Sequence, residues 1–173
     1  MKHFTITRYK FPVREGNYFQ LLVDGQAFFT SMLNSIETAK QFILLEQYVF
    51  ESGYIADLFI DALIVAKGRG VAVYIIVDDY GGKKLKTADR RRMREAGLEL
   101  QFFNPVNFIN IYKSLFRDHR KILIVDHNVV YVGGAGISDD FDTSDIRSPN
   151  SGWHDVMLEI RGPVILDWIN SFR

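Results

Sequence analysis

The feature that most constrains the fold is an alternation of short apolar runs with segments whose apolar residues recur at helical spacing. Residues 26–40 and 55–67 carry apolar side chains three or four positions apart, as an amphipathic helix requires. Residues 42–50 and 71–77 are nearly continuous apolar runs, which is typical of strands buried on both faces. This exchange of helix and strand predicts an α/β fold in which a mixed β-sheet is sandwiched between helices.

Further elements follow the same alternation along the chain. A hairpin is expected to turn at His127 and Asn128, between two β-branched runs. Residues 1–15 lack clear periodicity and are expected to form an N-terminal arm, which leaves 16–173 as a single domain. The other expected strands are 19–24, 98–103, 121–126, 129–133 and 156–160, the other expected helices are 87–95 and 164–172, and an aromatic loop is expected over 104–116.

Composition excludes several classes of protein. The chain has no cysteine, so it can form neither a disulfide framework nor a thiolate metal site, and its scattered histidines predict no metal and no cofactor. Its 21 basic and 21 acidic residues balance, which argues against general binding of nucleic acid. Apolar runs stay below the roughly 18 residues needed to cross a bilayer, and the N-terminus lacks a signal-like apolar region. We therefore expect a cytoplasmic protein with at most peripheral membrane contact.

A basic segment over residues 83–94 departs from this overall balance. It has two interpretations. It is either the solvated face of a helix that follows a loop, or a landing patch for anionic lipid headgroups.

The segment from Asp118 to Asp126 carries the strongest chemical signal. In an extended strand, residues two apart share a face, so His119 and Lys121 are expected to project toward the same point. An imidazole can act as a nucleophile, and a lysine ammonium can bind phosphate oxygens. The pair therefore predicts chemistry on a phosphodiester.

The complete pattern is His119-x-Lys121, four residues, Asp126, six residues and then Gly133-Gly134, and it resembles the signature of the phospholipase D superfamily. The resemblance covers roughly residues 16–173 and implies one phospholipase D-like domain. Segments similar to the bacterial cardiolipin synthase branch are 17–25, 43–50, 94–105, 117–121, 132–134 and 153–163.

The resemblance also implies roles for the two motif residues. His119 would form a phosphohistidine, Lys121 would bind the phosphate oxygens, and a second histidine from a partner half would supply the acid. Only one copy of the motif occurs in this chain. We therefore expect the N-terminal half of a two-domain enzyme, or a subunit that pairs with itself, and we expect the isolated half to be nearly inactive.

Two aspartates are candidates for holding the histidine. Asp155 is the preferred residue, because related proteins carry a carboxylate there, although a turn aspartate that opens a strand fits equally well. Asp126 is the motif aspartate and a catalytic candidate. In an ideal strand, however, its side chain falls on the opposite face from Lys121, so capping of a turn is at least as plausible.

The remaining candidates would bind substrate. Glu46 interrupts an apolar strand, so its carboxylate needs a partner or must line the pocket. Gly133 and Gly134 would let the backbone approach a phosphate closely, and Arg117 adjoins the motif within the similar segment. Gly136 stands where the family usually has a phosphate-holding asparagine.

The leading hypothesis is phosphatidyl transfer between phospholipids, with a phosphatidylglycerol-like substrate and no nucleic acid. The protein would act peripherally at the inner face of the cell membrane. One alternative is a homodimeric phosphodiesterase or nuclease of the same superfamily. Another is an inactive phosphate-binding module, which the missing asparagine keeps open.

Overall fold

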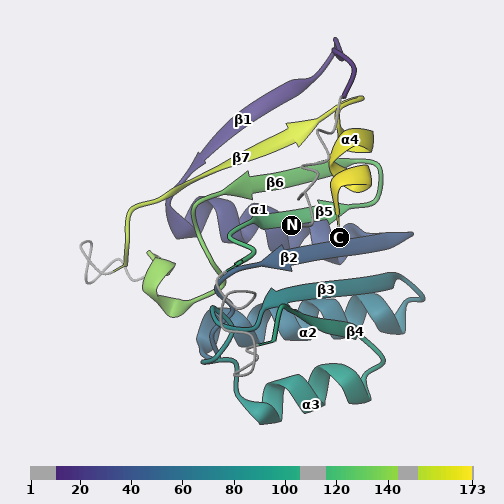
Figure 1. Cartoon of the computed structure of the whole chain (residues 1–173). Helices are drawn as coiled ribbons and strands as arrows, with labels where there is room; N and C mark the ends of the chain where they lie inside the picture. The colour runs from purple at the N-terminus through teal and green to yellow at the C-terminus, as the bar shows by residue number, and fades with distance from the viewer. Residues whose placement is uncertain (1–10, 106–115, 144–151, 173) are drawn as a thin grey trace, which may run out of the picture.

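Seven strands form one sheet in the computed structural model, which describes residues 11–105, 116–143 and 152–172 (Figure 1). The order across the sheet is β1-β7-β6-β5-β2-β3-β4. The strands are β1 (Tyr18–Val23), β2 (Phe42–Gln47), β3 (Ala72–Asp78), β4 (Glu99–Phe103), β5 (Lys121–Val125), β6 (Val129–Gly133) and β7 (Val156–Arg161). The helices are α1 (Asp24–Thr38), α2 (Tyr54–Gly68), α3 (Thr87–Glu95), α4 (Ile165–Ser171) and a short 3-10 helix, η2 (Asp139–Phe141).

The sheet is mixed, as the sequence predicts. β2, β3 and β4 run parallel, and α2 and α3 provide the crossovers that parallel neighbours need. β5 pairs antiparallel with β2, and β6, β7 and β1 continue the antiparallel half. As a result, the carboxyl ends of β2, β3 and β4 lie at the same edge of the sheet as the amino ends of β5 and β7.

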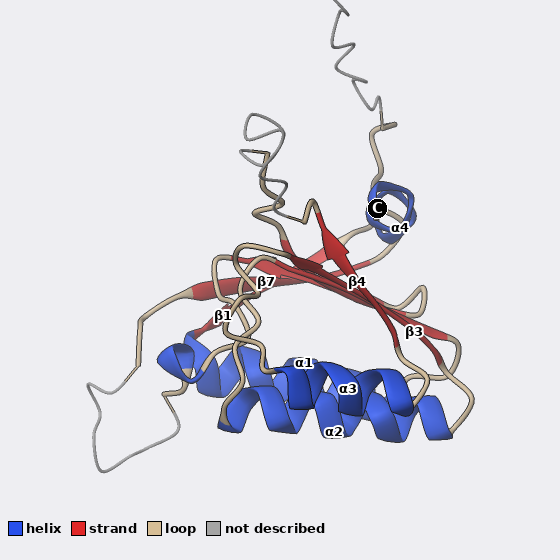
Figure 2. Ribbon diagram, turned by 60° about the horizontal axis from the view of Figure 1, so that its bottom comes forward, coloured by secondary structure: helices blue, strands red, loops and turns tan. Residues whose placement is uncertain are grey.

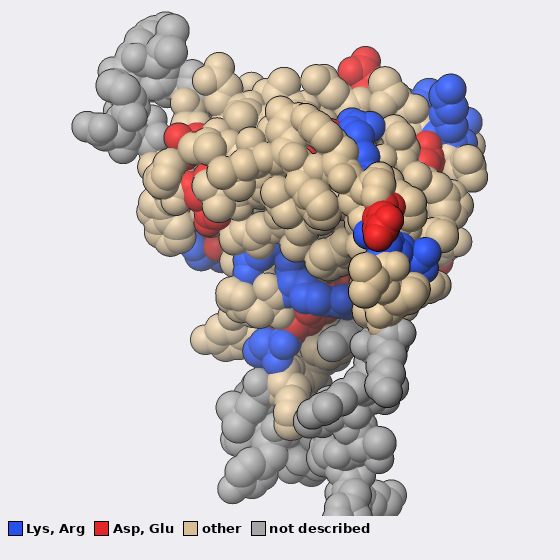
Figure 3. All heavy atoms as spheres, turned by 90° about the horizontal axis from the view of Figure 1, so that it is seen from above, with Lys and Arg blue, Asp and Glu red and all other residues tan. Residues whose placement is uncertain are grey.

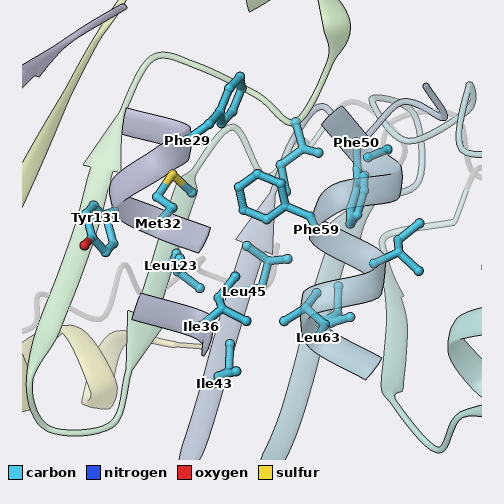
Figure 4. Packing of buried hydrophobic residues seen from close by; sticks show 14 of the residues in the cluster. Phe29, Met32, Ile36, Ile43, Leu45, Phe50, Phe59, Leu63, Leu123 and Tyr131 are labelled. Atoms are coloured by element: carbon cyan, nitrogen blue, oxygen red, sulfur yellow. The ribbon is translucent and has the colours of Figure 1, made fainter. Parts of the chain in front are cut away.

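Helices cover the two faces of the sheet unequally. α1, α2 and α3 form a continuous layer on one face, and α4 lies alone on the other (Figure 2). We call these the three-helix face and the α4 face. The larger apolar core fills the three-helix face, where Phe29, Ile36, Leu45, Phe59 and Leu123 interdigitate (Figure 4).

A smaller apolar cluster packs under α4. It contains Leu44, Ile122, Ile124, Val130, Ile160 and Ile165. Because the central strands are buried on both faces, β2 and β5 read as continuous apolar runs rather than alternating ones. Burial of each large aliphatic or aromatic side chain contributes about 1.5–3 kcal/mol, so this two-sided burial favours the observed strand register.

The expected elements agree with the structure to within a few residues, and the differences have local causes. The first helix begins at Asp24, with φ 65°, a residue that the sequence pattern assigns to the end of the first strand. Gly25 follows because a Cβ there would overlap the carbonyl group of Phe141. The second strand ends at Gln47, and Phe50 continues it only as an isolated bridge to Ile137.

Two expected segments fall partly outside the described residues. Residues 1–10 of the N-terminal arm and 106–115 of the aromatic loop are not described. In the described part of the arm, Arg14 forms an ion pair with Asp167 of α4, with Nε 2.5 Å from Oδ2. The arm is therefore attached to the α4 face at this point.

Candidate functional site

The candidate site lies at the edge of the sheet where β2 and β3 end and β5 and β7 begin. This is the edge at which α/β sheets commonly bind ligands, outside the carboxyl ends of parallel strands. His119 precedes β5 and is exposed to solvent. Lys121 is the first residue of β5 and is only 6% exposed.

The two motif side chains converge, which confirms the expected shared face. Lys121 Nζ lies 2.9 Å from His119 Nδ1 and 3.0 Å from the His119 carbonyl oxygen. Leu123 and Val125, which share a face of β5 with Lys121, belong to the core of the three-helix face, so the pair lies at the rim of that face. A lysine ammonium that donates to Nδ1 leaves the proton of a neutral imidazole on Nε2.

Burial lowers the pKa of the Lys121 ammonium. The negative charges of Asp155 and Asp118 act in the opposite direction and raise it. Burial is the larger effect, and the two carboxylates partly offset the cost of placing a charge on Lys121 there. Such an ammonium is suited to neutralise a phosphate group.

Tyr48 is a site residue to which sequence reasoning assigns no role. Its ring centroid lies 4.3 Å from that of His119 at an angle of 40°, and Lys121 Nζ lies 5.2 Å from the same ring. Tyr48 N also donates to the Arg120 carbonyl oxygen at 3.0 Å, which extends the pairing of β2 with β5 beyond the strand ends. The sequence feature that could have identified Tyr48 is its position directly after the buried residues of β2.

Gln47 is a second residue without a predicted role. It is 1% exposed and faces Lys121 across the β2–β5 ladder. Its side-chain amide has no hydrogen-bond partner within the described part of the chain. A buried amide without a hydrogen-bond partner destabilises the fold. Gln47 therefore leaves one donor group and one acceptor oxygen available at the floor of the site.

Asp155 lies close enough to act electrostatically on Lys121. Its Oδ1 accepts a hydrogen bond from Val156 N at 2.7 Å, and its carbonyl oxygen accepts one from Asp24 N at 2.9 Å. Next to it, His154 Nδ1 lies 2.6 Å from Asp24 Oδ1. The proposed action of Asp155 on the His119 ring remains a prediction, supported by its place at the same edge.

The motif glycines serve a different contact from the one expected. A Cβ at Gly133 would lie 2.8 Å from Met157 Cα, and one at Gly134 would lie 2.5 Å from Asp155 Oδ1. Their small size therefore allows β7 to approach β6, and it places the Asp155 carboxylate beside the turn. Close approach to a phosphate is not what the structure requires of them.

Gly136, at the position of the family's asparagine, is also tightly enclosed. A Cβ there would lie 2.6 Å from Val49 Cβ. Ile137 N donates to the Val49 carbonyl oxygen at 3.0 Å, so this backbone cannot easily move away. Val49, which lies just after β2 in the chain, therefore leaves no room for a side chain at 136.

Asp126 lies apart from the His119–Lys121 pair, and a catalytic role for it remains a prediction. It follows the far end of β5, about 16 Å from Lys121 at 3.3 Å per residue. Its carboxylate accepts hydrogen bonds from the backbone N–H groups of Lys40 (3.0 Å), Gln41 (2.8 Å) and Phe42 (2.9 Å). This is the capping role that the sequence left open.

Replacing Asp126 with alanine is expected to lower the free energy of unfolding by about 1–3 kcal/mol, because backbone donors lose a charged acceptor. Asp126→Asn is the matched control, since it keeps one acceptor oxygen and tolerates the observed φ of 53°. Urea unfolding would measure both. Loss of phosphate chemistry at full stability in the alanine variant would contradict the structural role.

Glu46 lies on the opposite side of the sheet from the motif pair, and binding of substrate by it remains a prediction. It shares the α4 face with Leu44, whereas Leu45 belongs to the three-helix face. Its carboxyl group contacts the guanidinium of Arg120. The partner that the sequence required is therefore present, and it is a side chain rather than a substrate.

Arg117 is held by the protein itself. Its Nη1 lies 3.5 Å from Asp78 Oδ1 and donates to the Asn104 carbonyl oxygen at 3.2 Å. Asp78 is fully buried at the end of β3. These contacts fasten the start of the motif segment, and binding of substrate by Arg117 remains a prediction.

The basic segment has acidic partners in the same domain. Arg92 lies 3.4 Å from Asp57 and also contacts Asp61, and Lys84 lies 3.0 Å from Glu51. These pairs favour the solvated-helix interpretation over a free cationic patch. Figure 3 shows the opposite side of the molecule from α3, the side on which β1 lies, and there basic and acidic side chains lie around a largely uncharged centre.

No group of His, Asp and Glu side chains in 11–105, 116–143 and 152–172 is arranged to hold a metal ion. Within those same ranges, none of the helices combines the length and the apolar character that a transmembrane helix needs.

Comparison with known proteins places this geometry in context. A family described as cardiolipin synthase, phospholipase D-like domain, matches residues 32–142. A cardiolipin synthase of Oceanobacillus iheyensis is 31% identical over 167 residues, covering 92% of this chain and 34% of the relative. Cardiolipin synthase 1 of Staphylococcus epidermidis is 32% identical over 165 residues, covering 89% and 33%. The chain thus spans about a third of the length of these relatives.

Solved structures share the fold. Nuc of Salmonella typhimurium, a phospholipase D family member, superposes with a TM-score of 0.65 at 20% identity, covering 91% of this chain and 92% of that one. NucT of Helicobacter pylori gives a TM-score of 0.66 at 16% identity, covering 91% and 94%. At these identities the likeness concerns the fold alone, and it agrees with the α/β architecture predicted from the sequence.

Proposed function

Because the chain belongs to the cardiolipin synthase family of phospholipase D-like domains, we propose that it supplies one half of an active site for phosphatidyl transfer between phospholipids. The observation that carries this proposal is the convergence of His119 and Lys121 at an open sheet edge, 2.9 Å apart. The relatives' description as cardiolipin synthases supports a lipid substrate.

In the proposed reaction, His119 Nε2 attacks the phosphorus of a phosphatidylglycerol-like donor. The bond from phosphorus to the leaving glycerol oxygen breaks, and an acid from the second half protonates that oxygen. The hydroxyl of a second lipid then attacks the phosphohistidine and gives up its proton to the same group. The histidine is thereby regenerated, and the phosphatidyl group has changed its acceptor.

Lys121 has two tasks in this scheme. Its ammonium neutralises the nonbridging oxygens of the phosphate. When those oxygens attract Nζ, its contact with His119 Nδ1 is released. Nδ1 can then carry the ring proton, which leaves Nε2 free to attack. Asp155 is proposed to hold that proton, and Tyr48 supports the face of the ring.

The second half of the site is proposed to come from another domain or another subunit. His119 is exposed, so a matching surface can reach it. The chain covers about a third of the length of its curated relatives, which leaves room in a protein of their size for a second motif. Because the proposed substrate is a phospholipid, the protein would work peripherally at the inner face of the cell membrane.

A lipid assay tests the proposal directly. Protein containing this chain, incubated with phosphatidylglycerol vesicles, is expected to form cardiolipin and release glycerol, both measurable by mass spectrometry. A labelled donor should leave acid-labile label on the protein. Absence of product and of label with every phospholipid pair offered would refute the proposal.

A homodimeric phosphodiesterase is the second candidate, favoured by the single motif in this chain. Two copies of His119 would share one site across a two-fold axis. Sedimentation distinguishes the candidates, because a strict monomer is incompatible with this arrangement. Hydrolysis of DNA by a dimer, with no lipid transfer, would favour it.

A further inference from the structure

A polar cluster lies behind the motif on the α4 face. It consists of Glu46, Asp118 and Arg120, and we call it the carboxyl–guanidinium cluster. Glu46 is 1% exposed and Asp118 is 3% exposed. The guanidinium of Arg120 donates to Glu46 Oε1, and its Nε lies 3.4 Å from Asp118 Oδ1. Arg120 Nη1 donates to the Ser171 carbonyl oxygen at 2.9 Å, which joins the cluster to the end of α4.

This cluster fixes the backbone that carries His119. Asp118 Oδ1 accepts a hydrogen bond from Arg120 N at 3.3 Å, so the two residues flanking His119 are tied together. The Arg120 carbonyl oxygen accepts from Tyr48 N at 3.0 Å, and Asp118 N donates to Asp78 Oδ2 at 2.9 Å. The His119 side chain therefore projects from a peptide segment that is held on both sides.

Charge balance within the cluster depends on one proton. With both carboxyls ionised, the cluster would carry one uncompensated negative charge in a buried place, which is unfavourable. Burial and, after it, the Asp118 carboxylate raise the pKa of Glu46 to about 8, against the opposing effect of Arg120. With a pKa of about 8, Glu46 is protonated at neutral pH and the cluster is neutral.

Other charged groups face the cluster from the packed elements. Asp78 and Arg117 lie behind Asp118 and pair with each other. Asp167 of α4 lines a cavity together with Arg120, but it pairs with Arg14. The groups that act on the Glu46 carboxyl are Asp118 and Arg120.

We propose that Glu46 is a positioning residue for His119. In its neutral form it completes the carboxyl–guanidinium cluster and holds the segment 118–120, and its ionisation loosens that segment and moves the imidazole relative to Lys121. Glu46 acts through the backbone and Arg120, from the opposite side of the sheet to the substrate. The functional meaning rests on the proposed role of His119, whereas the coupling itself does not require catalysis.

The sign of the pH effect follows from the direction of the shift. The pKa of Glu46 in the folded chain lies above its ordinary value, so the folded state holds this proton more tightly than the unfolded state. Its contribution to stability is complete in acid, below the ordinary value of about 4.5. That contribution falls as the pH rises and is lost once the pH passes about 8.

Titration followed by NMR tests the coupling in the chain itself. The Cε1–H resonance of His119 is followed from about pH 5 to about pH 10, a range that covers both groups. The wild-type resonance is expected to show its own titration and a second step near pH 8, where Glu46 ionises. Glu46→Gln keeps the shape and the neutral form, so the second step should disappear while the melting temperature at neutral pH changes little.

Glu159→Gln is the matched control. Glu159 is another buried glutamate, 5% exposed, but it pairs with Arg161 on β7. The second step should persist in this variant. A second step that persists in Glu46→Gln, or that is missing from the wild type, overturns the proposal. If Glu46→Gln does not fold, the carboxyl carbon of wild-type Glu46 is titrated directly, and an ordinary pKa for it likewise overturns the proposal.

The NMR titration tests the coupling of Glu46 to His119, and the lipid assay tests the proposed function, so either proposal can fail without the other. A chain with the second step but no phosphatidyl transfer would keep the coupling and remove the proposed function. A chain with phosphatidyl transfer but no second step would keep the proposed function and remove the coupling. In an active protein, the alkaline decline of kcat should move to higher pH in Glu46→Gln, which a purely structural glutamate would not cause.

Discussion

Replacing His119 with alanine is expected to lower the rate of phosphatidyl transfer by about 10³-fold or more, because the covalent intermediate can no longer form. The neighbouring backbone should be undisturbed, since His119 is exposed and the segment around it is held by Asp118 and Arg120. Thermal unfolding should therefore change little. Transfer is measured as cardiolipin formed from phosphatidylglycerol vesicles.

His127→Ala is the control for this experiment. His127 is also exposed, but it lies in the turn after β5, at the opposite end of the strand, where its ring packs edge-on against Phe42 at 5.0 Å. It should keep wild-type activity. Equal losses in both variants, or retained phosphohistidine labelling in His119→Ala, would show that the nucleophile lies elsewhere.

Replacing Lys121 with methionine is expected to lower transfer by about 10²–10³-fold, the usual effect of removing one preorganised group that stabilises negative charge. Methionine resembles the lysine side chain in length and can occupy its buried position, which is only 6% exposed. The variant should therefore fold. Because the ammonium acts most strongly on the transition state, kcat should fall more than KM rises.

A Lys121→Arg variant should also lose activity, although it keeps the positive charge. The guanidinium is larger and planar, and the buried site beside Tyr48 and His119 is shaped for a compact ammonium. Lys83→Met provides a surface control, since Lys83 lies 4.0 Å from the ring of Tyr80 and outside the motif. A Lys121→Met variant with wild-type kcat would exclude the proposed contact with the phosphate.

The fold follows from the sequence where burial is two-sided. The continuous apolar runs of β2 and β5 are consistent with central strands only, and helical spacing marked α1 and α2 to within a few residues. The convergence of His119 and Lys121 was also predictable, because strand geometry is local. Two positions on one strand need no knowledge of the rest of the chain.

Contacts between distant segments were not predictable in this way. The partners of Asp126 lie 84 to 86 residues earlier in the chain, and Arg120 contacts Glu46 from 74 residues away. The roles of Asp126 and Glu46 depend on which end and which face of the sheet each occupies. Glu46 and Lys121 lie on opposite faces of the sheet. Strand alternation alone does not show this, because the pairing of β2 with β5 must also be known.

The close packing of Gly136 against Val49 has a consequence for how such sequences can diverge. An asparagine at 136 would overlap the Cβ atom and the carbonyl oxygen of Val49, so a smaller side chain at 49 would not admit it and the backbone itself would have to move. The hydrogen bond from Ile137 N to the Val49 carbonyl oxygen holds that backbone in place. Homologues with a side chain at 136 should therefore differ from this chain in the path of the backbone after β2.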